Sequence, residues 1–233
     1  MDVTRIYLAG PDVFAAEADV LGRRKTDLCA VYGFTGLFPL DSDHEHPTHR
    51  PQTVAFDPGP SFFETTATAD RSSEVRQATG AAGKTTNISV SARIYDANLA
   101  ALRNCDAVIA NLTPFRGVSA DVGTVFELAY AIARGTPVFA YTNVASDLAD
   151  RVALAFGRAV SGGASARILA DDGMEIENFG LTDNLMIVEA IRAQGWDIVA
   201  HAVPADRAMT DLEAFEACLV QVRAHVAGLK PTG

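Results

Sequence analysis

Asp106-Ala107-Val108-Ile109-Ala110-Asn111-Leu112 is the clearest strand in this sequence of 233 residues. A short apolar run of this kind predicts a strand that is buried on both faces of a parallel sheet. The periodic stretch 121–134 predicts a helix that ends at Gly135, and residues 136–141 predict the next strand. This alternation indicates an α/β fold, a parallel sheet covered by helices on both faces.

The first forty residues have the same rhythm. Residues 4–9 predict a short buried strand that Gly10-Pro11 breaks, and residues 35–40 predict a second strand. Between them, residues 15–32 predict a helix that ends at Gly33. Its expected apolar stripe is Val20, Leu21, Leu28 and Val31.

The remaining helices are expected on both sides of this unit. Residues 88–103 show a helical pattern through Val90, Ile94, Leu99 and Leu102. Further helices are predicted over 148–159 and 183–193, and a last strand over 196–200. The final helix is predicted over 210–226, with Thr210 as N-cap and Glu213 completing a capping box.

Residues 42–86 interrupt this order. They are rich in Ser, Thr, Ala, Gly, Pro and His, and only residues 61–76 suit a helix. A stretch of this length without regular structure is typical of a functional lid or arm, or of a poorly ordered segment. Because nothing resembles a linker between two cores, we expect one domain over 1–233 with residues 42–86 as an insertion or lid.

Composition limits the class of protein. The net charge is −10 and there is no basic block, so nucleic acid and anionic membranes are unlikely partners. Three widely spaced cysteines predict a reduced, cytoplasmic chain without a disulfide framework. No apolar run is long enough to span a membrane, and the N-terminus lacks the order of a signal peptide.

A cluster of histidines bears on metal binding, and the glycine-rich motifs of nucleotide-binding proteins are absent. His44, Glu45, His46 and His49 could ligate zinc, but Pro47 and the missing i, i+4 register favour a solvated loop. The sequence also has no Gly-x-Gly-x-x-Gly and no Walker lysine, which disfavours hydride-transfer enzymes and P-loop kinases. We therefore expect neither a metal nor a cofactor.

Glu127 is the strongest candidate for chemistry. Ligands of open parallel sheets bind beyond the carboxyl ends of the strands, where the predicted helix over 121–134 begins. No cation lies on the helix face of Glu127, and the absence of a side chain at Gly123, one turn earlier, leaves it uncovered. We expect the helix N-terminus to stabilise this carboxylate as an anion, ready to act as a nucleophile. The alternative is a structural Glu that bonds to a loop backbone.

Other candidate site residues can each have either a functional or a purely structural role. Asp121 either caps the helix or faces the substrate. Tyr7 lies in the first strand, where its buried phenol needs a partner, and Glu127 is one candidate. Phe115 and Arg116 lie on a loop where an aromatic ring and a cation can meet a base or a sugar, or simply face solvent.

Four blocks in order carry a resemblance to a known family. They are Tyr7-Leu-Ala-Gly-Pro-Asp-Val-Phe14, Cys105-Asp-Ala-Val-Ile-Ala-Asn-Leu-Thr-Pro-Phe-Arg-Gly117, Ala120-Asp-Val-Gly-Thr-Val-Phe-Glu-Leu-Ala-Tyr130 and Phe179-Gly-Leu-Thr-Asp-Asn-Leu-Met186. Together they resemble the nucleoside 2-deoxyribosyltransferase family. The resemblance implies a flavodoxin-like sheet and an enzyme of nucleotide salvage that exchanges nucleobases on 2-deoxyribose in two steps.

The resemblance also implies roles for individual residues. Glu127 would attack the anomeric carbon, Tyr7 would orient its carboxylate, and Asp121 would bind the deoxyribose hydroxyls. Asn184 and Met186 would reach into the site of an adjacent subunit, which implies a homo-oligomer. The other expected substrate-binding residues are Asp43 on the base side, Gly10, Phe14, Asn98 and Arg116.

One position departs from the family. Some members carry an Asp where this sequence has Asn98 on the helix before the third strand, and an amide cannot supply a proton as an acid does. Two other functions remain open from the sequence. One is hydrolysis of the N-glycosidic bond of nucleosides or their 5′-monophosphates by the same Glu. The other is a nucleoside-binding module without turnover.

Overall fold

The computed structural model describes residues 4–39, 89–157, 159–161 and 167–228. The predicted insertion over 42–86, with its helix over 61–76 and its histidine cluster, lies outside the described residues. The part that is described contains the sheet, its covering helices and most of the predicted site.

A five-stranded parallel sheet forms the centre of the structure. Its strand order is β2-β1-β3-β4-β7, the order of doubly wound sheets of the flavodoxin type. Register places Tyr7 beside Val108 and Asn111 beside Tyr141. The strands are β1 (Arg5–Ala9), β2 (Thr35–Leu37), β3 (Ala107–Asn111), β4 (Val138–Thr142) and β7 (Val199–Ala200). The predicted α/β class and flavodoxin-like sheet are confirmed.

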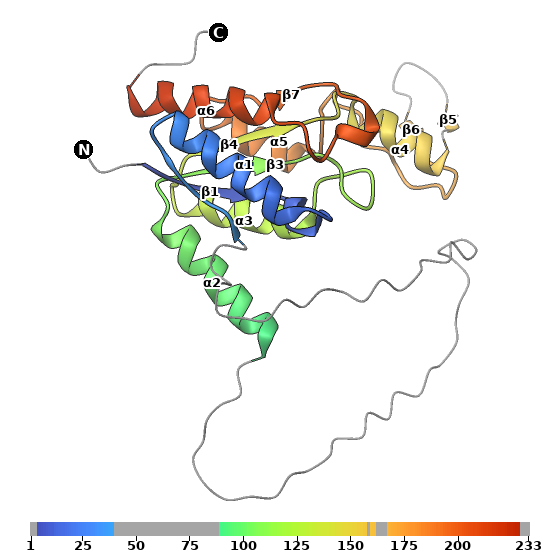
Figure 1. The fold of residues 1–233 in the computed structure, drawn as a ribbon. Helices are drawn as coiled ribbons and strands as arrows, with labels where there is room; N and C mark the ends of the chain where they lie inside the picture. The colour runs from blue at the N-terminus through green and yellow to red at the C-terminus, as the bar shows by residue number, and fades with distance from the viewer. Residues whose placement is uncertain (1–3, 40–88, 158, 162–166, 229–233) are drawn as a thin grey trace, which may run out of the picture.

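Helices cover both faces of this sheet. Figure 1 shows α1 and α6 on one side and α2 and α3 on the other. The helices are α1 (Ala18–Val31), α2 (Val90–Asn104), α3 (Val122–Ala133), α4 (Leu148–Phe156), α5 (Leu185–Arg192) and α6 (Glu213–Val226). Short 3-10 turns, η1 (Pro11–Phe14) and η3 (Ala205–Arg207), follow β1 and precede α6.

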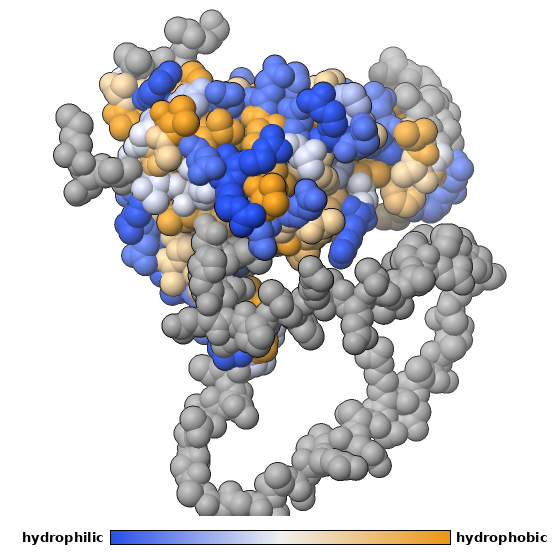
Figure 2. All heavy atoms as spheres, viewed as in Figure 1, coloured by the Kyte–Doolittle hydropathy of each residue, from blue (hydrophilic) through white to orange (hydrophobic). Residues whose placement is uncertain are grey.

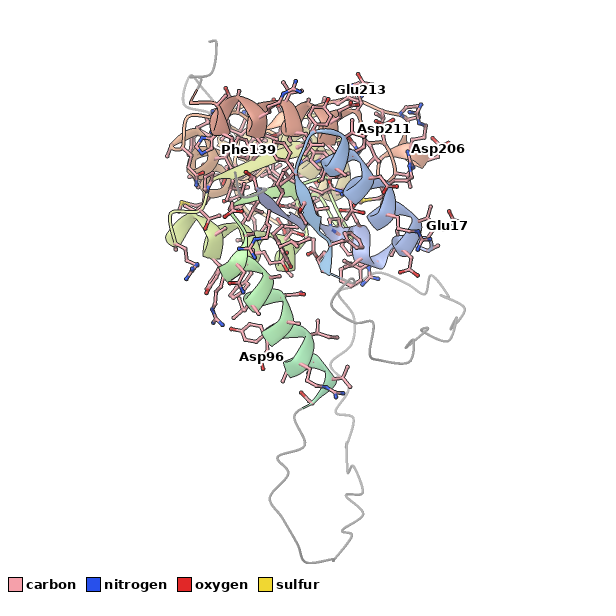
Figure 3. The ribbon with its side chains drawn as sticks, turned by 60° about the vertical axis from the view of Figure 1, so that its left-hand side comes forward. Glu17, Asp96, Phe139, Asp206, Asp211 and Glu213 are labelled. Atoms are coloured by element: carbon pink, nitrogen blue, oxygen red, sulfur yellow. The ribbon has the colours of Figure 1, made fainter. Side chains whose placement is uncertain are left out.

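The core lies between the sheet and these helices. Every residue of β3 and β4 is buried, as expected of strands covered on both faces. Phe139 on β4 packs against Trp196 with ring centroids 4.9 Å apart. Figure 3 shows Phe139 inside the layered body, whereas Asp96 lies on the part of α2 that extends from it.

Two predicted apolar stripes are only partly correct. On α1, Val20 and Val31 are 43% and 79% exposed, and Lys25 and Cys29 are buried instead. On the face carrying α1 and α6, hydrophilic and hydrophobic residues are interspersed (Figure 2). The side of α1 that packs is therefore rotated from the expected stripe.

The stripe on α2 fails for a different reason. Leu99 and Leu102 are buried as predicted, but Val90 and Ile94 are 57% and 42% exposed. The first half of α2 extends beyond the sheet, where there is nothing among the described residues to cover it (Figure 1). Periodicity shows which residues share a helix face, but not how far the neighbouring sheet reaches.

Helix ends follow the expected chemistry in two places. Gly33 and Gly135 have φ values of 83° and 76°, the left-handed conformation that glycine adopts after a helix. The predicted capping box at Thr210 is wrong. The N-cap is Leu212, and the carboxylate of the preceding Asp211 accepts from the Glu213 backbone N–H through Oδ1 at 3.0 Å. The chain turns through η3 first, so the helix begins three residues later than predicted.

The segment between β4 and α5 contains structure that the sequence did not reveal. The predicted helix over 148–159 ends at Phe156. An antiparallel hairpin follows, formed by β5 (Ala159–Ser161) and β6 (Arg167–Leu169). Strands of three residues are too short to show an alternating pattern.

The three cysteines are not joined to one another. Cys29 and Cys218 are buried and Cys105 is half-buried, and all are free thiols. Burial raises the pKa of the Cys29 thiol to about 12, so this thiol stays protonated and unreactive. Among the described helices, none combines the length and the apolar character needed to cross a membrane.

Two leucines in helices provide a test of this core. Leu219 on α6 is fully buried, and Leu154 on α4 is 90% exposed. We expect Leu219→Ala to lower the free energy of unfolding by about 2–5 kcal/mol, because it leaves a cavity. The matched Leu154→Ala should change it by less than about 0.5 kcal/mol. Urea unfolding followed by circular dichroism measures both, and equal effects would contradict the packing described here.

Candidate active site

The candidate site lies at the carboxyl edge of the sheet, where the loops after β1 and β3 meet. Both strands are parallel and adjacent, so their following loops emerge side by side. The first loop forms η1 with Phe14, and the second runs through Arg116 to Asp121 at the start of α3. Glu127 projects from α3 toward the first of these strands.

Tyr7 and Glu127 form the central contact of the site. The Tyr7 hydroxyl donates a hydrogen bond to Glu127 Oε1 at 2.6 Å, across 120 residues of sequence. Tyr7 is 0% exposed and fixed within β1, so it holds the carboxylate in one orientation. No cation among the described residues pairs with Glu127. The hydrogen bond that the sequence suggested is present.

Burial dominates the electrostatics of Glu127. It raises the pKa of this carboxyl to about 7, and nearby Asp121 acts in the same direction, while the Tyr7 hydrogen bond opposes both. Burial and the adjacent carboxylate also raise the pKa of the Tyr7 phenol far above its ordinary value. Tyr7 therefore remains a hydrogen-bond donor at any physiological pH.

This result corrects the expected role of the helix N-terminus. We expected unpaired backbone N–H groups to favour the ionised carboxylate of Glu127. The helix begins at Val122, so Glu127 lies beyond the first turn, where the helix dipole has little effect. Burial has the larger effect, so the pKa of Glu127 is raised rather than lowered.

Asp121 is the N-cap of α3, as the structural alternative predicted. Its Oδ2 accepts from the Thr124 backbone N–H at 2.9 Å and from the Thr124 hydroxyl at 3.1 Å. A Cβ added at Gly123 would lie 3.0 Å from the same oxygen, so glycine keeps this carboxylate uncrowded. The cap fixes Asp121 close enough to Glu127 to influence its charge.

An aromatic pair and an arginine lie at the rim of the site. The rings of Phe14 and Phe115 stack with centroids 5.2 Å apart and an interplanar angle of 14°. The Arg116 guanidinium lies 5.5 Å and 4.8 Å from the two ring centroids. Phe14 is 57% exposed, so the group presents a flat surface on which a heterocyclic base can stack.

The loop before α3 is fixed by Asp183, whose role the sequence did not reveal. The Asp183 side chain is buried and accepts from the Ser119 hydroxyl and from the Ala120 N–H at 2.9 Å. Arg151 lies 3.9 Å from it and donates to the backbone carbonyls of Val118 and Thr182. Asp183 thus holds the loop before α3, and it is not the cap of α5.

Asn184 caps α5 instead. Its side chain accepts from the Met186 N–H at 3.0 Å and donates to Glu177 at 2.9 Å. Met186 is 72% exposed. Through Asp183, this turn is joined to the loop before α3 of the same chain. A role of Asn184 and Met186 in an adjacent subunit's site remains a prediction.

The other predicted residues have different positions. Gly10 directly follows β1, and a Cβ there would come within 2.2 Å of an Asp12 oxygen, so only glycine fits. Asn98 is half-buried on α2, and no contact described here joins it to Glu127. Asp43 lies outside the described residues.

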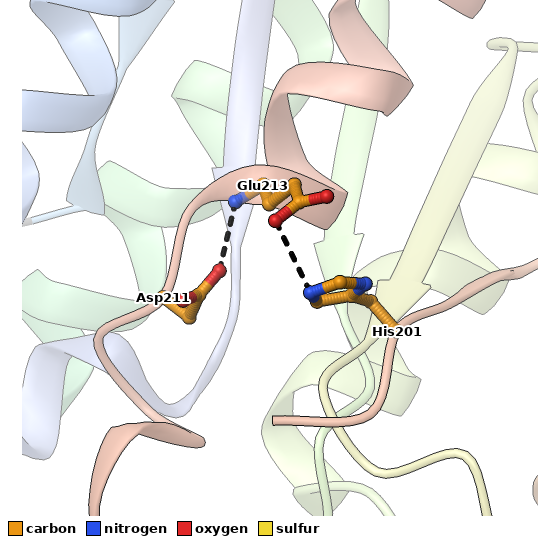
Figure 4. A group of neighbouring side chains, drawn as sticks. All are labelled: His201, Asp211 and Glu213. Atoms are coloured by element: carbon orange, nitrogen blue, oxygen red, sulfur yellow. Dashed lines mark hydrogen bonds and ion pairs between the residues drawn. The ribbon is translucent and has the colours of Figure 1, made fainter. Parts of the chain in front are cut away.

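A group of possible metal ligands lies elsewhere, at the start of α6. Oxygen and nitrogen atoms of His201, Asp211 and Glu213 lie within 4.8 Å of one another. His201 Nε2 lies 3.3 Å from Glu213 Oε2, and Asp211 Oδ1 accepts from the Glu213 backbone N–H. Figure 4 shows the three residues side by side. Arg207 pairs with Asp211 as well. Asp211, one of the three possible ligands, is therefore already paired with a cationic side chain.

Comparison with known proteins gives the site its context. A family model described as nucleoside 2-deoxyribosyltransferase matches residues 6–186. A 2-desoxiribosyltransferase from Leishmania mexicana has a similar structure, with 26% identity, a TM-score of 0.50, and coverage of 88% of this chain and 93% of that one.

Two further structures are more distant. A 2-deoxyribosyltransferase from Bacillus psychrosaccharolyticus has 16% identity, a TM-score of 0.36 and coverage of 59% and 72% of the two chains. A conserved protein from Enterococcus faecalis has 18% identity, a TM-score of 0.44 and coverage of 94% and 99%.

Among curated proteins, no sequence matches this chain. The family match covers β1, β3, the helix α3 and the turn at Asn184. The chain belongs to the nucleoside 2-deoxyribosyltransferase family.

Proposed function

We propose that this protein transfers 2-deoxyribose from a deoxynucleoside to a free nucleobase, with Glu127 as the nucleophile. The observation that carries the proposal is the 2.6 Å hydrogen bond between Tyr7 and Glu127 at the carboxyl edge of the sheet. Membership of the family supports the same activity. A half-buried carboxylate without a paired cation is suited to attack a sugar carbon.

In the first step, an oxygen of Glu127 bonds to C1′ of the deoxyribose as the bond from C1′ to the base nitrogen breaks. The electron pair of that bond goes to the departing base, which takes up a proton. The transition state resembles an oxocarbenium ion, so the negative carboxylate stabilises it before trapping it. Tyr7 occupies one lone pair of Oε1 and keeps the group oriented toward the sugar.

In the second step, a nitrogen of the incoming base attacks C1′ and the bond from C1′ to the Glu127 oxygen breaks, which restores the carboxylate. The incoming nitrogen loses its proton to solvent, which balances the proton that the departing base took up. Each step inverts the configuration, so the product retains the original configuration. Asp121 is proposed to bind sugar hydroxyls, and Phe14 with Arg116 to stack on the base. Asn98 would hydrogen-bond to the base without supplying a proton as an acid does. Asn184 and Met186 are proposed to complete the site of an adjacent subunit in a homo-oligomer.

The activity itself is tested by incubating one deoxynucleoside with a different free base. We expect a new deoxynucleoside, detected by liquid chromatography, and its rate should fall by about three orders of magnitude or more in Glu127→Gln. Glu189→Gln is the matched control, because Glu189 is exposed on α5 and pairs with Arg192 on the same helix. Release of free base and free sugar alone, even at high acceptor concentration, would show a hydrolase instead.

The covalent step is tested by mass spectrometry of the intact protein with a 2-fluoro-2-deoxynucleoside. Fluorine destabilises the oxocarbenium-like transition state, so the sugar should accumulate on the enzyme. We expect one added fluorosugar, located on Glu127 by peptide mapping and absent from Glu127→Gln. An adduct on another residue would exclude Glu127 as the nucleophile.

The pH dependence tests the role of Tyr7. The reaction needs ionised Glu127, so kcat/KM should rise with pH through about 7, the raised pKa of this carboxyl. The Tyr7 hydrogen bond lowers that pKa, so Tyr7→Phe should move the rise to higher pH. A pH profile recorded for both proteins checks this. An unchanged midpoint in Tyr7→Phe would mean that the hydrogen bond does not control the charge of Glu127.

A further inference from the structure

We propose that Lys25, acting through Asp12 and Asn111, positions the loops that carry Phe14 and Phe115 as one platform for the nucleobase. The nucleobase in this inference rests on the proposed function. The positioning itself rests on contacts that are independent of Glu127. The three residues come from α1, η1 and β3, three elements that converge beneath the rim of the site.

Lys25 and Asp12 form a fully buried ion pair. Each residue is 1% exposed, and Lys25 Nζ lies 2.8 Å from Asp12 Oδ2. Lys25 Nζ also lies 5.4 Å and 5.2 Å from the ring centroids of Tyr141 and Phe215. Removing two charges from water is costly, and an apolar pair of similar volume often stabilises a fold as well. Net stabilisation is therefore a weak explanation for the buried Lys25–Asp12 pair. A better one is that the pair fixes the relative positions of the segments that it joins.

Asn111 extends the ion pair into a continuous polar chain. Its Nδ2 donates to the two Asp12 carboxylate oxygens at 3.2 Å and 3.3 Å, and its Oδ1 accepts from the Thr113 N–H at 3.0 Å. The Thr113 hydroxyl in turn accepts from the Asn143 N–H at 3.0 Å. These bonds link the residues that follow β1, β3 and β4 at the carboxyl edge of the sheet.

The platform is carried by the two loops that this chain ties together. Phe14 ends the 3-10 turn that contains Asp12, and Phe115 follows Thr113 by two residues. Their stacking and the position of Arg116 over both rings depend on the spacing of these loops. A Cβ at Gly10 would meet Asp12 Oδ2 at 2.2 Å, so the carboxylate fits closely under its own turn. Loss of the ion pair should therefore loosen the Phe14 loop first.

The decisive variant is the double substitution Lys25→Met with Asp12→Asn. Lys25→Met alone leaves an unpaired buried carboxylate and can prevent folding, whereas the double variant removes both charges and keeps an acceptor for Asn111. We expect its melting temperature to return toward that of the wild type. We expect KM for the deoxynucleoside to rise by about tenfold or more while kcat changes by less than about threefold, because the reacting groups stay in place.

The matched control is Arg23→Met, which removes a cation from an exposed position on the same helix. Its KM and kcat should equal those of the wild type. A double variant that is stable and has the wild-type KM would overturn the proposal, because the ion pair would then be structural only. A fall in kcat as large as the rise in KM would also overturn it, since it would indicate general damage to the fold.

Hydrogen exchange of the wild type, the control and the double variant separates this inference from the proposed function. If the wild type transfers no deoxyribose, the proposed function fails, but the positioning can still be measured. Faster exchange of the backbone amides over 10–15 in the double variant alone, with β3 and β4 unchanged, supports the positioning role. Equal exchange in all three proteins contradicts it.

Discussion

The hydrogen bond between Tyr7 and Glu127 joins the first strand to the helix α3 and sets what the site can do. It places a carboxylate at the carboxyl edge of the sheet in a fixed orientation. Burial raises the pKa of this carboxyl, and the hydrogen bond from the phenol partly offsets that effect. The same burial that makes the anion costly also removes the water that would weaken its interaction with a developing positive charge.

The surroundings of this bond show how the fold maintains it. The cap at Asp121 fixes the start of α3, and Asp183 with Arg151 fixes the loop that leads into it. On the other side, the buried Lys25–Asp12 pair fixes the turn after β1. The Asp121 cap is local, whereas the Asp183 contact joins residues 63 positions apart in the sequence. The edge of the sheet is thus held by polar contacts, whereas its centre is held by apolar packing.

The polar contacts at this edge have different costs. Asp183 is satisfied by backbone and hydroxyl donors, so its burial is compensated by hydrogen bonds. The cost of burying the charges of Lys25 and Asp12 is compensated by their ion pair, and Asn111 donates a further hydrogen bond to the Asp12 carboxylate. The cost of burying the Glu127 carboxylate is compensated only in part, by the hydrogen bond from Tyr7. This difference separates the carboxylates that build the fold from Glu127, the one proposed to act as the nucleophile.

The sequence by itself determined the α/β class, the order of the main strands and helices, and the glycines that end α1 and α3. These features depend on local periodicity and on backbone conformations that few residues adopt. The motif blocks also pointed to Tyr7 and Glu127. Only the tertiary structure decided which helix faces are buried, because this depends on which side α1 turns toward the core and on how far the sheet extends under α2. It also decided the raised pKa of Glu127 and the roles of Lys25 and Asp183. Burial and long-range contacts control those properties, and neither can be read from neighbouring residues in the chain.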